Sequence, residues 1–459
     1  MYDPLVNSTP AKQPFCESYW ASTVKLGHAL PPLKGRQHTD VAIIGAGYTG
    51  LLTAYYLASQ YHIDCHVLEA NQVGFGASAR NAGFVLKGSG RLGYAEMEKR
   101  WDLNTAKGIY AEFSQAVARV EQLIQQHNIQ CEPQQKGYLK VAHNPKALQQ
   151  LQAAADYIQH KLLEGSNNGA SDSRAFQAEF IDADTFRAEY LNHHQAYGAL
   201  RLNDGFGVNP LKLLLGYKDM VLQQGVTLSE QSCVIDWQQE NNQHRLITDQ
   251  GELLANKVIM AGNAYTPKRF HAATDNKYLP ILSNVIVTEP LTAEELHIAG
   301  IHTTQVTMDT RILKYYYRLL PDNRLLFGGR GAVWGKDAHQ PIYGQRLKLA
   351  LDKCFPILAN KKVQFNWTGW IAAAFDDMPH VYCQNGLGYS LGYCGAGVSF
   401  SSQAAYRLAQ AIAGETLPNL PLYRQPLPSH PSSILPFGQV KRIGQWGYYH
   451  YGWLKDRFG

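Results

Sequence analysis

The stretch DVAIIGAGYTGLLTAYYLASQYHIDCHVLEA, residues 40–70, combines a short apolar run, three glycines and a helical pattern. Residues 41–44 are uniformly apolar, which is typical of a parallel strand buried on both faces. Gly45, Gly47 and Gly50 follow with the spacing G-x-G-x-x-G, and a second apolar run ends at Glu69. Strand, glycine turn, helix, strand and acid in this order predict a binding site for a dinucleotide.

Each part of this pattern has a physical role. Gly45 permits a tight turn, Gly47 lets the backbone approach a pyrophosphate, and Gly50 lets the helix lie close to the strand. The start of the helix offers unpaired N–H groups to the phosphates. Glu69, 19 residues beyond Gly50, can accept hydrogen bonds from ribose hydroxyls. The stretch alone does not distinguish FAD from NAD.

Length and composition limit the remaining possibilities. A chain of 459 residues predicts two or three domains. Hydrophobic residues make up 45% and charged residues 17%, as in soluble globular proteins. The net charge of +5, without a long Lys/Arg run, gives no reason to expect a nucleic-acid partner.

Compartment signals point to the cytoplasm. The chain shows no signal-peptide pattern and no apolar run of the ~20 residues that a transmembrane segment needs. The seven cysteines are scattered and form no C-x-x-C pair, which favours a reducing compartment and gives no metal site.

Two further loops are rich in small residues. In GFGASARNAGFV, residues 74–85, Ser78 and Arg80 could reach a phosphate, although a plain surface loop fits equally well. Residues 386–415 predict a strand, a glycine loop at 395–397 and a helix that ends at Gly414. That helix start would be a second cluster of N–H donors. One ligand that touches loops so far apart would be long, with a charged middle.

The rest of the chain alternates between helical and strand patterns. We expect helices at 106–127, at 145–163 and from Asn209 to Gly225, strands within 226–237 and 244–265, and a polar loop at 164–173. Residues 311–331 predict a hairpin around Pro321-Asp322-Asn323. The tyrosines at 315–317 could line a pocket, but at least one should pack within the sheet, because neighbours in a strand face opposite ways.

Several motifs together carry a family resemblance: SYW at 18–20, GASARNAG at 76–83, GNAY at 262–265, YYRLLPDNRLLFGG at 316–329, MPHV at 378–381 and GYCGAGV at 392–398. Over nearly its full length the chain resembles the D-amino-acid-oxidase-type FAD-dependent oxidoreductases. Within that family it is most similar to the gamma-glutamylputrescine oxidoreductase branch.

The resemblance implies an α/β fold, with a Rossmann-like FAD-binding domain and an interleaved α+β substrate domain built on an antiparallel sheet. The FAD-binding domain would comprise residues 36–96, 198–265 and 367–430. The substrate domain would comprise 97–197 and 266–366. Residues 1–35 would form an N-terminal arm and residues 431–459 a C-terminal tail.

The resemblance also implies where FAD would bind. The pyrophosphate would contact Gly45, Ala46, Gly47, Tyr48, Thr49 and Gly50. The adenosine would contact Glu69, Ala70 and the backbone of Val234, with Gly262 nearby. The flavin would be lined by Ser78, Arg80, Asn81, Ala82, Gly83, Gly395, Ala396, Gly397 and Val398.

The chain departs from the family patterns at a few positions. Ala79 and Ala82 replace glycines usual in the branch, and Ala396 stands where the branch often has histidine. Where the sarcosine-oxidase branch has a cysteine that anchors the flavin, this chain has Tyr315, so FAD should be bound non-covalently. Ile371 falls where related amino-acid oxidases carry an arginine for the substrate carboxylate.

The expected function is oxidation of a C–N bond in a primary or secondary amine, by hydride transfer to flavin N5, with oxygen or another electron acceptor. The absent arginine favours a putrescine-like or gamma-glutamyl amine whose reacting carbon carries no carboxylate. The implied mechanism needs no acid or base from the protein, so no catalytic side chain is assigned. Substrate-lining candidates are Tyr315, Tyr317, Arg318, Arg330 and Ile371. Arg311 could bind a substrate carboxylate in place of the absent arginine.

Two alternatives stay open. The aromatic and partly basic tail at 444–459 would suit a membrane-associated dehydrogenase that passes electrons to a quinone, although a helix or strap packed on the body is the preferred explanation of the tail. The substitutions at Ala79, Ala82 and Ala396 would also suit a flavin-binding partner or maturation protein without small-molecule turnover.

Overall fold

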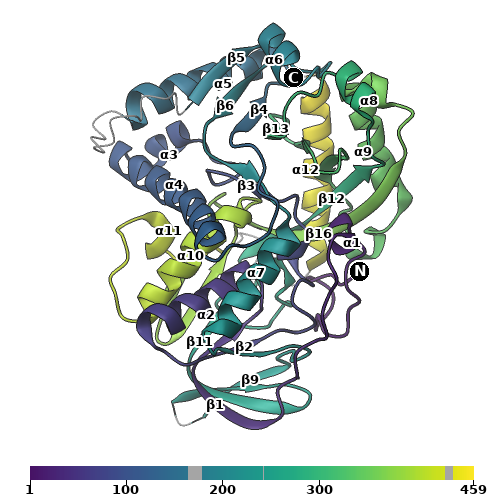
Figure 1. Ribbon diagram of the computed structural model, residues 1–459. Coiled ribbons are helices and arrows are strands. Elements are labelled where there is room, and N and C mark those ends of the chain that lie inside the picture. The colour runs from purple at the N-terminus through teal and green to yellow at the C-terminus, as the bar shows by residue number, and fades with distance from the viewer. Residues whose placement is uncertain (164–177, 241, 430–437, 459) are drawn as a thin grey trace.

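The computed structural model describes residues 1–163, 178–240, 242–429 and 438–458. The predicted polar loop at 164–173 lies outside these ranges. The fold contains two large sheets, the first in the lower and the second in the upper part of Figure 1, with helices around both. The predicted α/β class is confirmed.

The first sheet is mostly parallel and has the strand order β17-β18-β11-β1-β2-β8, with β10 and β9 added beyond β11. Strand β1 pairs in parallel with both β2 and β11. This confirms the predicted strand–helix–strand unit at residues 40–70. The strands are β1 (Gly35–Ile44), β2 (Cys65–Leu68), β8 (Thr227–Ser229), β9 (Asp236–Glu240), β10 (Gln243–Ile247), β11 (Gly251–Met260), β17 (His380–Gln384) and β18 (Leu387–Leu391).

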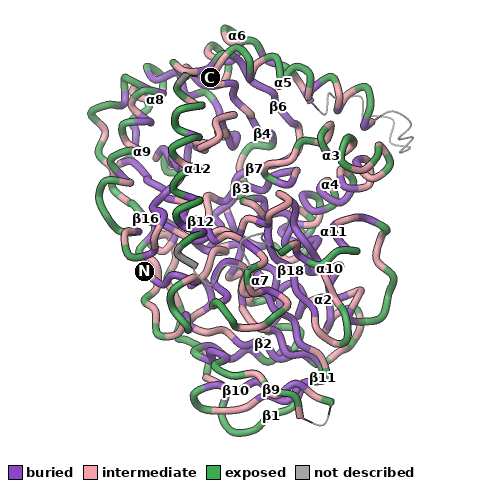
Figure 2. The backbone as a smooth tube through the Cα atoms, turned by 180° about the vertical axis from the view of Figure 1, so that it is seen from behind, coloured by how far each residue is buried: buried purple, intermediate pink, exposed green. Residues whose placement is uncertain are grey.

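Burial explains the unbroken apolar run in β1. Val41 and Ile43 pack into the main core with the helices, whereas Ala42 faces a smaller core formed with Leu68 and Leu246. Both faces are therefore covered, and no polar residue alternates with the apolar ones between 41 and 44. Figure 2 shows buried backbone in the centre of the molecule, around β2 and β18, and exposed backbone at the lower end.

The second sheet is mainly antiparallel, with the order β16-β12-β15-β14-β13-β4-β6-β5. The predicted hairpin around Pro321 is present, with β14 and β15 paired antiparallel. A further two-stranded sheet joins β3 (Phe84–Val85) to β7 (Phe206–Gly207). The strands of the second sheet are β4 (Tyr138–Val141), β5 (Ala178–Asp182), β6 (Gly198–Leu202), β12 (Tyr278–Thr288), β13 (Val306–Asp309), β14 (Tyr316–Leu319), β15 (Leu325–Arg330) and β16 (Val363–Ala374).

The predicted helices are confirmed, and their starts follow ordinary capping chemistry. Asp102 accepts a hydrogen bond from the Thr105 N–H, and Asn209 accepts one from the Lys212 N–H. The predicted helix at 145–163 is α-helical to Tyr157 and continues as a π-helical turn. The helices are α1 (Tyr19–Ser22), α2 (Tyr48–Tyr61), α3 (Tyr94–Arg100), α4 (Leu103–Gln126), α5 (Pro145–Tyr157), α6 (Ala183–Glu189), α7 (Pro210–Gln223), α8 (Ala293–Ile298), α9 (Pro341–Cys354), α10 (Gly397–Ile412), α11 (Pro421–Arg424) and α12 (Gly438–Phe458).

Chain segments of the two sheets alternate along the sequence. Two of the expected FAD-binding segments begin at residues 198 and 367. Residue 198 is the first residue of β6 and residue 367 lies inside β16, and both strands belong to the second sheet. Because β16 is continuous to Ala374, the chain leaves the second sheet only after that residue. The division into cofactor and substrate segments stays a prediction.

The tail residues 438–458 form α12, the yellow helix that runs beside β12 in Figure 1. One face packs on the body: Arg442 donates to the Pro280 carbonyl and to the Asp3 carboxylate, each at 2.8 Å. The other face exposes Trp446 and Trp453. Within the described ranges, no helix has the length and apolar character that crossing a bilayer requires.

Candidate active site

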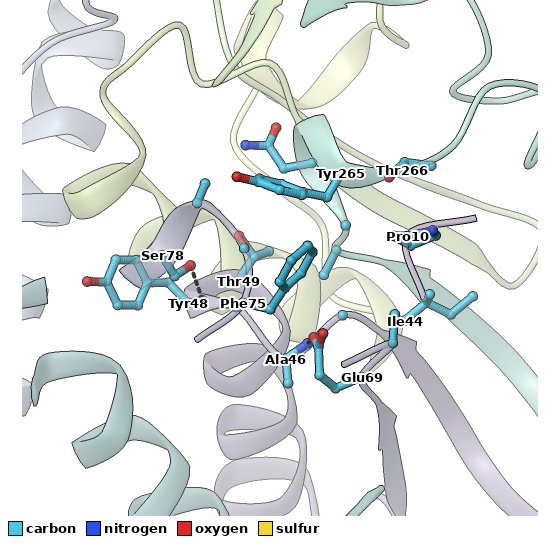
Figure 3. A pocket seen from close by; sticks show the side chains of 18 of the residues that line it. Pro10, Ile44, Ala46, Tyr48, Thr49, Glu69, Phe75, Ser78, Tyr265 and Thr266 are labelled. Atoms are coloured by element: carbon cyan, nitrogen blue, oxygen red, sulfur yellow. Dashed lines mark hydrogen bonds between the residues drawn. The ribbon is translucent and has the colours of Figure 1, made fainter. Parts of the chain in front are cut away.

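A cavity lined by the first glycine loop lies where β1, β2 and β11 meet the start of α2, and we call it the glycine cavity (Figure 3). It brings together residues from segments more than 300 positions apart in the sequence. Of the predicted cofactor-binding residues it is lined by Gly45, Ala46, Gly47, Tyr48, Thr49, Glu69, Ala70, Ser78, Asn81, Val234, Gly262, Gly395, Gly397 and Val398.

The glycines of the motif are required by close backbone contacts. Gly45 has φ +109°, and a Cβ there would lie 3.1 Å from the Ala261 carbonyl carbon. A Cβ on Gly50 would lie 1.9 Å from the Gly45 carbonyl oxygen. Gly50 does not line the cavity, and it acts as predicted by letting α2 approach β1.

Glu69 lies at the edge of the glycine cavity, beside Ala46 (Figure 3). Its carboxylate accepts hydrogen bonds from the Ala46 N–H at 2.9 Å and the Asn71 N–H at 3.1 Å. Burial raises the pKa of Glu69, whereas these N–H groups lower it. The acid therefore fixes the glycine turn and also presents oxygen atoms to the cavity.

Ser78 and Arg80 have different positions, although both were expected near phosphate. The Ser78 hydroxyl accepts from the Tyr48 N–H at 3.0 Å, at the start of α2 (Figure 3). Arg80 does not line the glycine cavity. Its Nε donates to the Phe75 carbonyl at 2.7 Å, and its guanidinium lies 4.9 Å from the Phe75 ring centroid. These carbonyl and ring contacts hold Arg80 outside the glycine cavity, which favours the plain-loop alternative over a phosphate contact, and its place beside the flavin stays a prediction.

Three buried side chains hold the loop at 77–83, and sequence reasoning did not identify this role. Trp20 donates to the Asn81 carbonyl at 2.8 Å, Trp367 to the Arg80 carbonyl at 2.9 Å, and Arg318 to the Ala82 carbonyl at 3.1 Å. The tryptophans of the SYW and NWTGW stretches were the available signal.

Arg318 is thus part of the loop support and does not line a substrate cavity. Arg318 also donates to the Val208 carbonyl at 2.6 Å. The backbone of Gly83 lies close to the same carbonyl oxygen. Burial lowers the pKa of Arg318 to about 9. The expectation that Arg318 lines the substrate site is wrong, because carbonyl groups of two loops engage its guanidinium.

A second cavity, which we call the basic cavity, lies against one face of the second sheet. It adjoins the glycine cavity, since Ala77, Asn81, Ile371, Gly395 and Val398 line both. The strands contribute Tyr138, Lys140, Leu200, Leu202, Ser283, Val285, Met308, Tyr316, Arg330, Gly369 and Ile371. Of the remaining predicted site residues, Arg80, Ala82 and Ala396 also line it.

Strand alternation decides which tyrosine faces the basic cavity. Tyr316 lines it, whereas Tyr317 is buried in the opposite core, stacked on Phe327 and His193. Tyr315 also packs against Phe327 and does not line the cavity. Tyr315 and Tyr317 were therefore the wrong candidates, because side chains one position apart in a strand point to opposite faces.

The basic cavity has a strong excess of positive side chains. Among the described residues, its only acidic lining residue is Glu96. Two of its cations are neutralised: Lys87 pairs with Asp204 at 2.7 Å and Arg91 with Asp377 at 3.5 Å. The cations that line it are Arg80, Lys87, Arg91, Lys140, Lys314 and Arg330.

Cys394 lines the basic cavity beside the second glycine loop. Its Sγ donates to the Gly392 carbonyl at 3.2 Å, and burial raises its pKa to about 12. A protonated thiol is a poor nucleophile. Ala79, one of the two alanines that replace glycine in the first small-residue loop, is buried and lines neither cavity.

Comparisons with known proteins agree with this geometry. Residues 40–411 match the family model described as FAD dependent oxidoreductase. Gamma-glutamylputrescine oxidoreductase of Escherichia coli is 31% identical over 96% of this chain and 98% of its own. L-proline dehydrogenase from P. horikoshii has a similar fold, with a TM-score of 0.67, 17% identity, and 86% and 96% of the two chains covered. Iminodiacetate oxidase from Chelativorans sp. BNC1 also has a similar fold, with a TM-score of 0.66 and 17% identity. The match covers 85% of this chain and 99% of that chain.

Proposed function

The chain belongs to the FAD-dependent oxidoreductase family, and from that premise we propose that it oxidises the C–N bond of an amine with a non-covalently held FAD. Its reacting carbon would carry no carboxylate. The observation that carries this proposal is the junction of the two cavities at Ile371, Gly395 and Val398, where a cofactor in one can meet a substrate in the other.

The residues of the glycine cavity fit FAD. Gly45 to Gly50 would hold the pyrophosphate at the start of α2, and the Glu69 carboxylate would accept from ribose hydroxyls. A Cβ on Gly395 would meet no atom within 4 Å, so the backbone at that end leaves room for a flat ring. When bound, FAD supplies the acceptor for a hydride from the carbon beside the nitrogen.

The start of α10 would favour negative charge on a group bound at the junction. Gly397 begins this 16-residue helix and lines the glycine cavity. The first N–H groups of a helix have no partner within it, and the helix dipole places partial positive charge there. Preorganised donors of this kind stabilise charge that develops during a reaction.

Ile371 supports an amine substrate over an α-amino acid. Its side chain forms an apolar wall at the junction of the cavities. An α-carboxylate on the reacting carbon would lie against this wall without a bidentate partner, which is unfavourable by several kcal/mol for a buried unpaired charge. The name of the Escherichia coli relative, gamma-glutamylputrescine oxidoreductase, suggests a gamma-glutamyl or putrescine-like amine.

The test is anaerobic bleaching of the flavin in purified protein. We expect gamma-glutamylputrescine or a related amine to bleach it, and glycine, D-alanine and sarcosine to leave it oxidised. Fast bleaching by the α-amino acids alone would contradict the substrate class. A flavin that no compound of the panel bleaches would instead favour a flavin-binding partner without turnover.

A dehydrogenase that uses a quinone or another acceptor is the second candidate. The observation in its favour is the outward face of α12, where Ile443, Trp446, Trp453 and Leu454 are about half exposed or more. Aromatic side chains of this kind suit a membrane interface. Oxygen uptake during turnover, compared with reduction of a water-soluble quinone, distinguishes an oxidase from such a dehydrogenase.

A further inference from the structure

Among the described residues, four cations of the basic cavity form no ion pair with an acid. One of them, Arg80, is held by the Phe75 carbonyl and ring, which leaves Lys140, Lys314 and Arg330. Among the residues the structure describes, no hydrogen bond or ion pair engages the side chain of Lys140 or Arg330, and both line the cavity. Lys314 donates only to the Gly90 carbonyl, at 2.7 Å. The acid that lines the cavity, Glu96, accepts from the Gly93 N–H at the start of α3, and its charge raises the pKa of Lys140 without forming an ion pair with it. We call Lys140, Lys314 and Arg330 the cation cluster.

The cation cluster is electrostatically unfavourable as it stands. Burial and, after it, the positive charges of Lys140, Arg330 and Arg91 together lower the pKa of Lys314 to about 7, with Asp309 acting in the opposite direction. Burial also lowers the pKa of Lys140. Like charges in a partly buried cavity repel each other, and an anion bound between them would relieve that repulsion.

The register of the second sheet sets the distance from the cation cluster to the reaction centre. Arg330 on β15 pairs with Ser283 on β12, and Ser283 pairs with Gly369 on β16, two residues before Ile371. Two strand spacings separate the Arg330 and Gly369 backbones by about 10 Å. Lys140 is farther out, in the cross-strand row with Met308 and Tyr316.

We propose that the cation cluster is a subsite for a carboxylate that the amine substrate carries several bonds away from its reacting carbon. This rests on the proposed function. The substrate would lie along the sheet face, with its reacting carbon near Ile371 and its carboxylate near Lys314 and Arg330. An Arg side chain can bind a carboxylate through two parallel hydrogen bonds, which gives direction as well as attraction.

This subsite divides the candidate amines. An α-amino acid carries its carboxylate on the reacting carbon and would place it at Ile371, away from the cation cluster. Free putrescine is a dication, so its second ammonium group would lie among like charges. A gamma-glutamyl amine carries a carboxylate several bonds away from the reacting carbon, so it would place an anion at the cation cluster.

The first test measures binding of an anion without turnover. Glutarate, a dicarboxylate with no amine, is titrated into the FAD-loaded protein, and binding is followed by calorimetry and by the flavin spectrum. We compare wild type with Arg330→Met and with Lys336→Met, which removes one exposed positive charge outside the cavity. Flavin content and thermal unfolding show whether each variant folds.

We expect Arg330→Met to weaken glutarate binding roughly 10- to 150-fold, as loss of a charge-assisted contact does, and Lys336→Met to leave it unchanged. Equal weakening in both variants would show a non-specific charge effect and overturn the proposal. Absence of glutarate binding in wild type would also overturn it, whatever the outcome with amines. Failure of every amine to bleach the flavin, with glutarate binding intact, would refute the proposed function instead.

The second test reverses the charge. In Arg330→Glu, we expect kcat/KM to fall for gamma-glutamylputrescine and to rise for putrescine relative to wild type. N-acetylputrescine, which lacks the carboxylate, should respond little to either Arg330 variant. A purely structural role of Arg330 would lower the rates for all three amines together, and that result would contradict the subsite.

Discussion

The Thr49 hydroxyl oxygen lies 2.6 Å from the Tyr393 hydroxyl oxygen, and this contact joins two segments that are 344 residues apart in the sequence. Thr49 belongs to the first turn of α2, and Tyr393 precedes the glycine loop that opens α10. Tyr393 also donates to the Ser390 hydroxyl at 2.8 Å. The two helix starts that face the glycine cavity are therefore fixed relative to each other by a buried chain of hydroxyl groups.

Tyr393→Phe should weaken FAD binding about 5- to 10-fold, because one buried hydrogen-bonding group is lost and its partners are left unpaired. The measurement is the FAD dissociation constant of refolded protein. Tyr389→Phe is the matched control: that tyrosine is also buried, but it accepts from the Leu427 N–H in another core. Similar weakening of FAD binding in both variants would show that only general stability is at work.

Glu69→Ala should raise the FAD dissociation constant by about 10- to 150-fold, since hydrogen bonds to a charged group contribute about 1.5–3 kcal/mol each. Glu69→Gln keeps one acceptor oxygen and should show an intermediate loss. Once saturated with FAD, both variants should be bleached by a good amine at the wild-type rate. An unchanged dissociation constant in Glu69→Ala would mean that Glu69 serves only the turn at Ala46.

FAD should be released when the protein is precipitated with acid. Tyr315 occupies the position expected for an anchoring cysteine and packs on Phe327, away from both cavities. Cys394 lies beside the junction, and burial raises the pKa of its thiol to about 12. The measurement is flavin absorbance in the supernatant after precipitation. Colour retained in the washed pellet would reveal a covalent bond and refute this prediction.

Arg318→Lys should lower the free energy of unfolding by about 2–4 kcal/mol and reduce retained FAD, with no change in preference among amines. A lysine cannot donate to the Ala82 and Val208 carbonyls at once, as the planar guanidinium does. Denaturant unfolding and flavin content measure the loss. Arg330→Met is the natural comparison, because it should change amine preference at nearly unchanged stability. A shift in preference in Arg318→Lys would place its side chain at the substrate after all.

The first sheet could be predicted because its signal is local. One stretch of 31 residues holds the second half of β1, the glycine turn, α2, β2 and Glu69, so the pattern can be recognised from neighbouring residues alone. The positions of Gly45 and Gly50 follow from backbone contacts that any such unit makes. The same locality made the hairpin around Pro321 predictable.

The faces of the second sheet could not be predicted in this way. Whether Tyr316 or Tyr317 lines the basic cavity depends on where α9 and Phe355 form the opposite core, and those lie far along the chain. Arg80 is oriented by Phe75 close by and by Tyr265 from a distant loop. The residues of the cation cluster come from three separate segments, β4, the 310–315 loop and β15. No sequence motif therefore predicts that they lie together.

Binding of glutarate should weaken as pH rises through 7, because Lys314 loses its charge in that range. Burial and the charges of Lys140, Arg330 and Arg91 lower its pKa to about 7, so the ammonium form dominates at pH 6 and the neutral amine at pH 8.5. Glutarate is ionised throughout, as side-chain carboxyls with pKa values near 4 are. We expect the dissociation constant to rise about 10-fold between these pH values.

Lys314→Met isolates this dependence, since the variant has no group at 314 to titrate. Its glutarate affinity should be weak at pH 6 and nearly the same at pH 8.5. Lys140→Met should keep the transition but move it to higher pH, because removal of a neighbouring positive charge raises the pKa of Lys314. A wild-type affinity that is constant from pH 6 to 8.5, or a transition that persists in Lys314→Met, would show that another group controls anion binding.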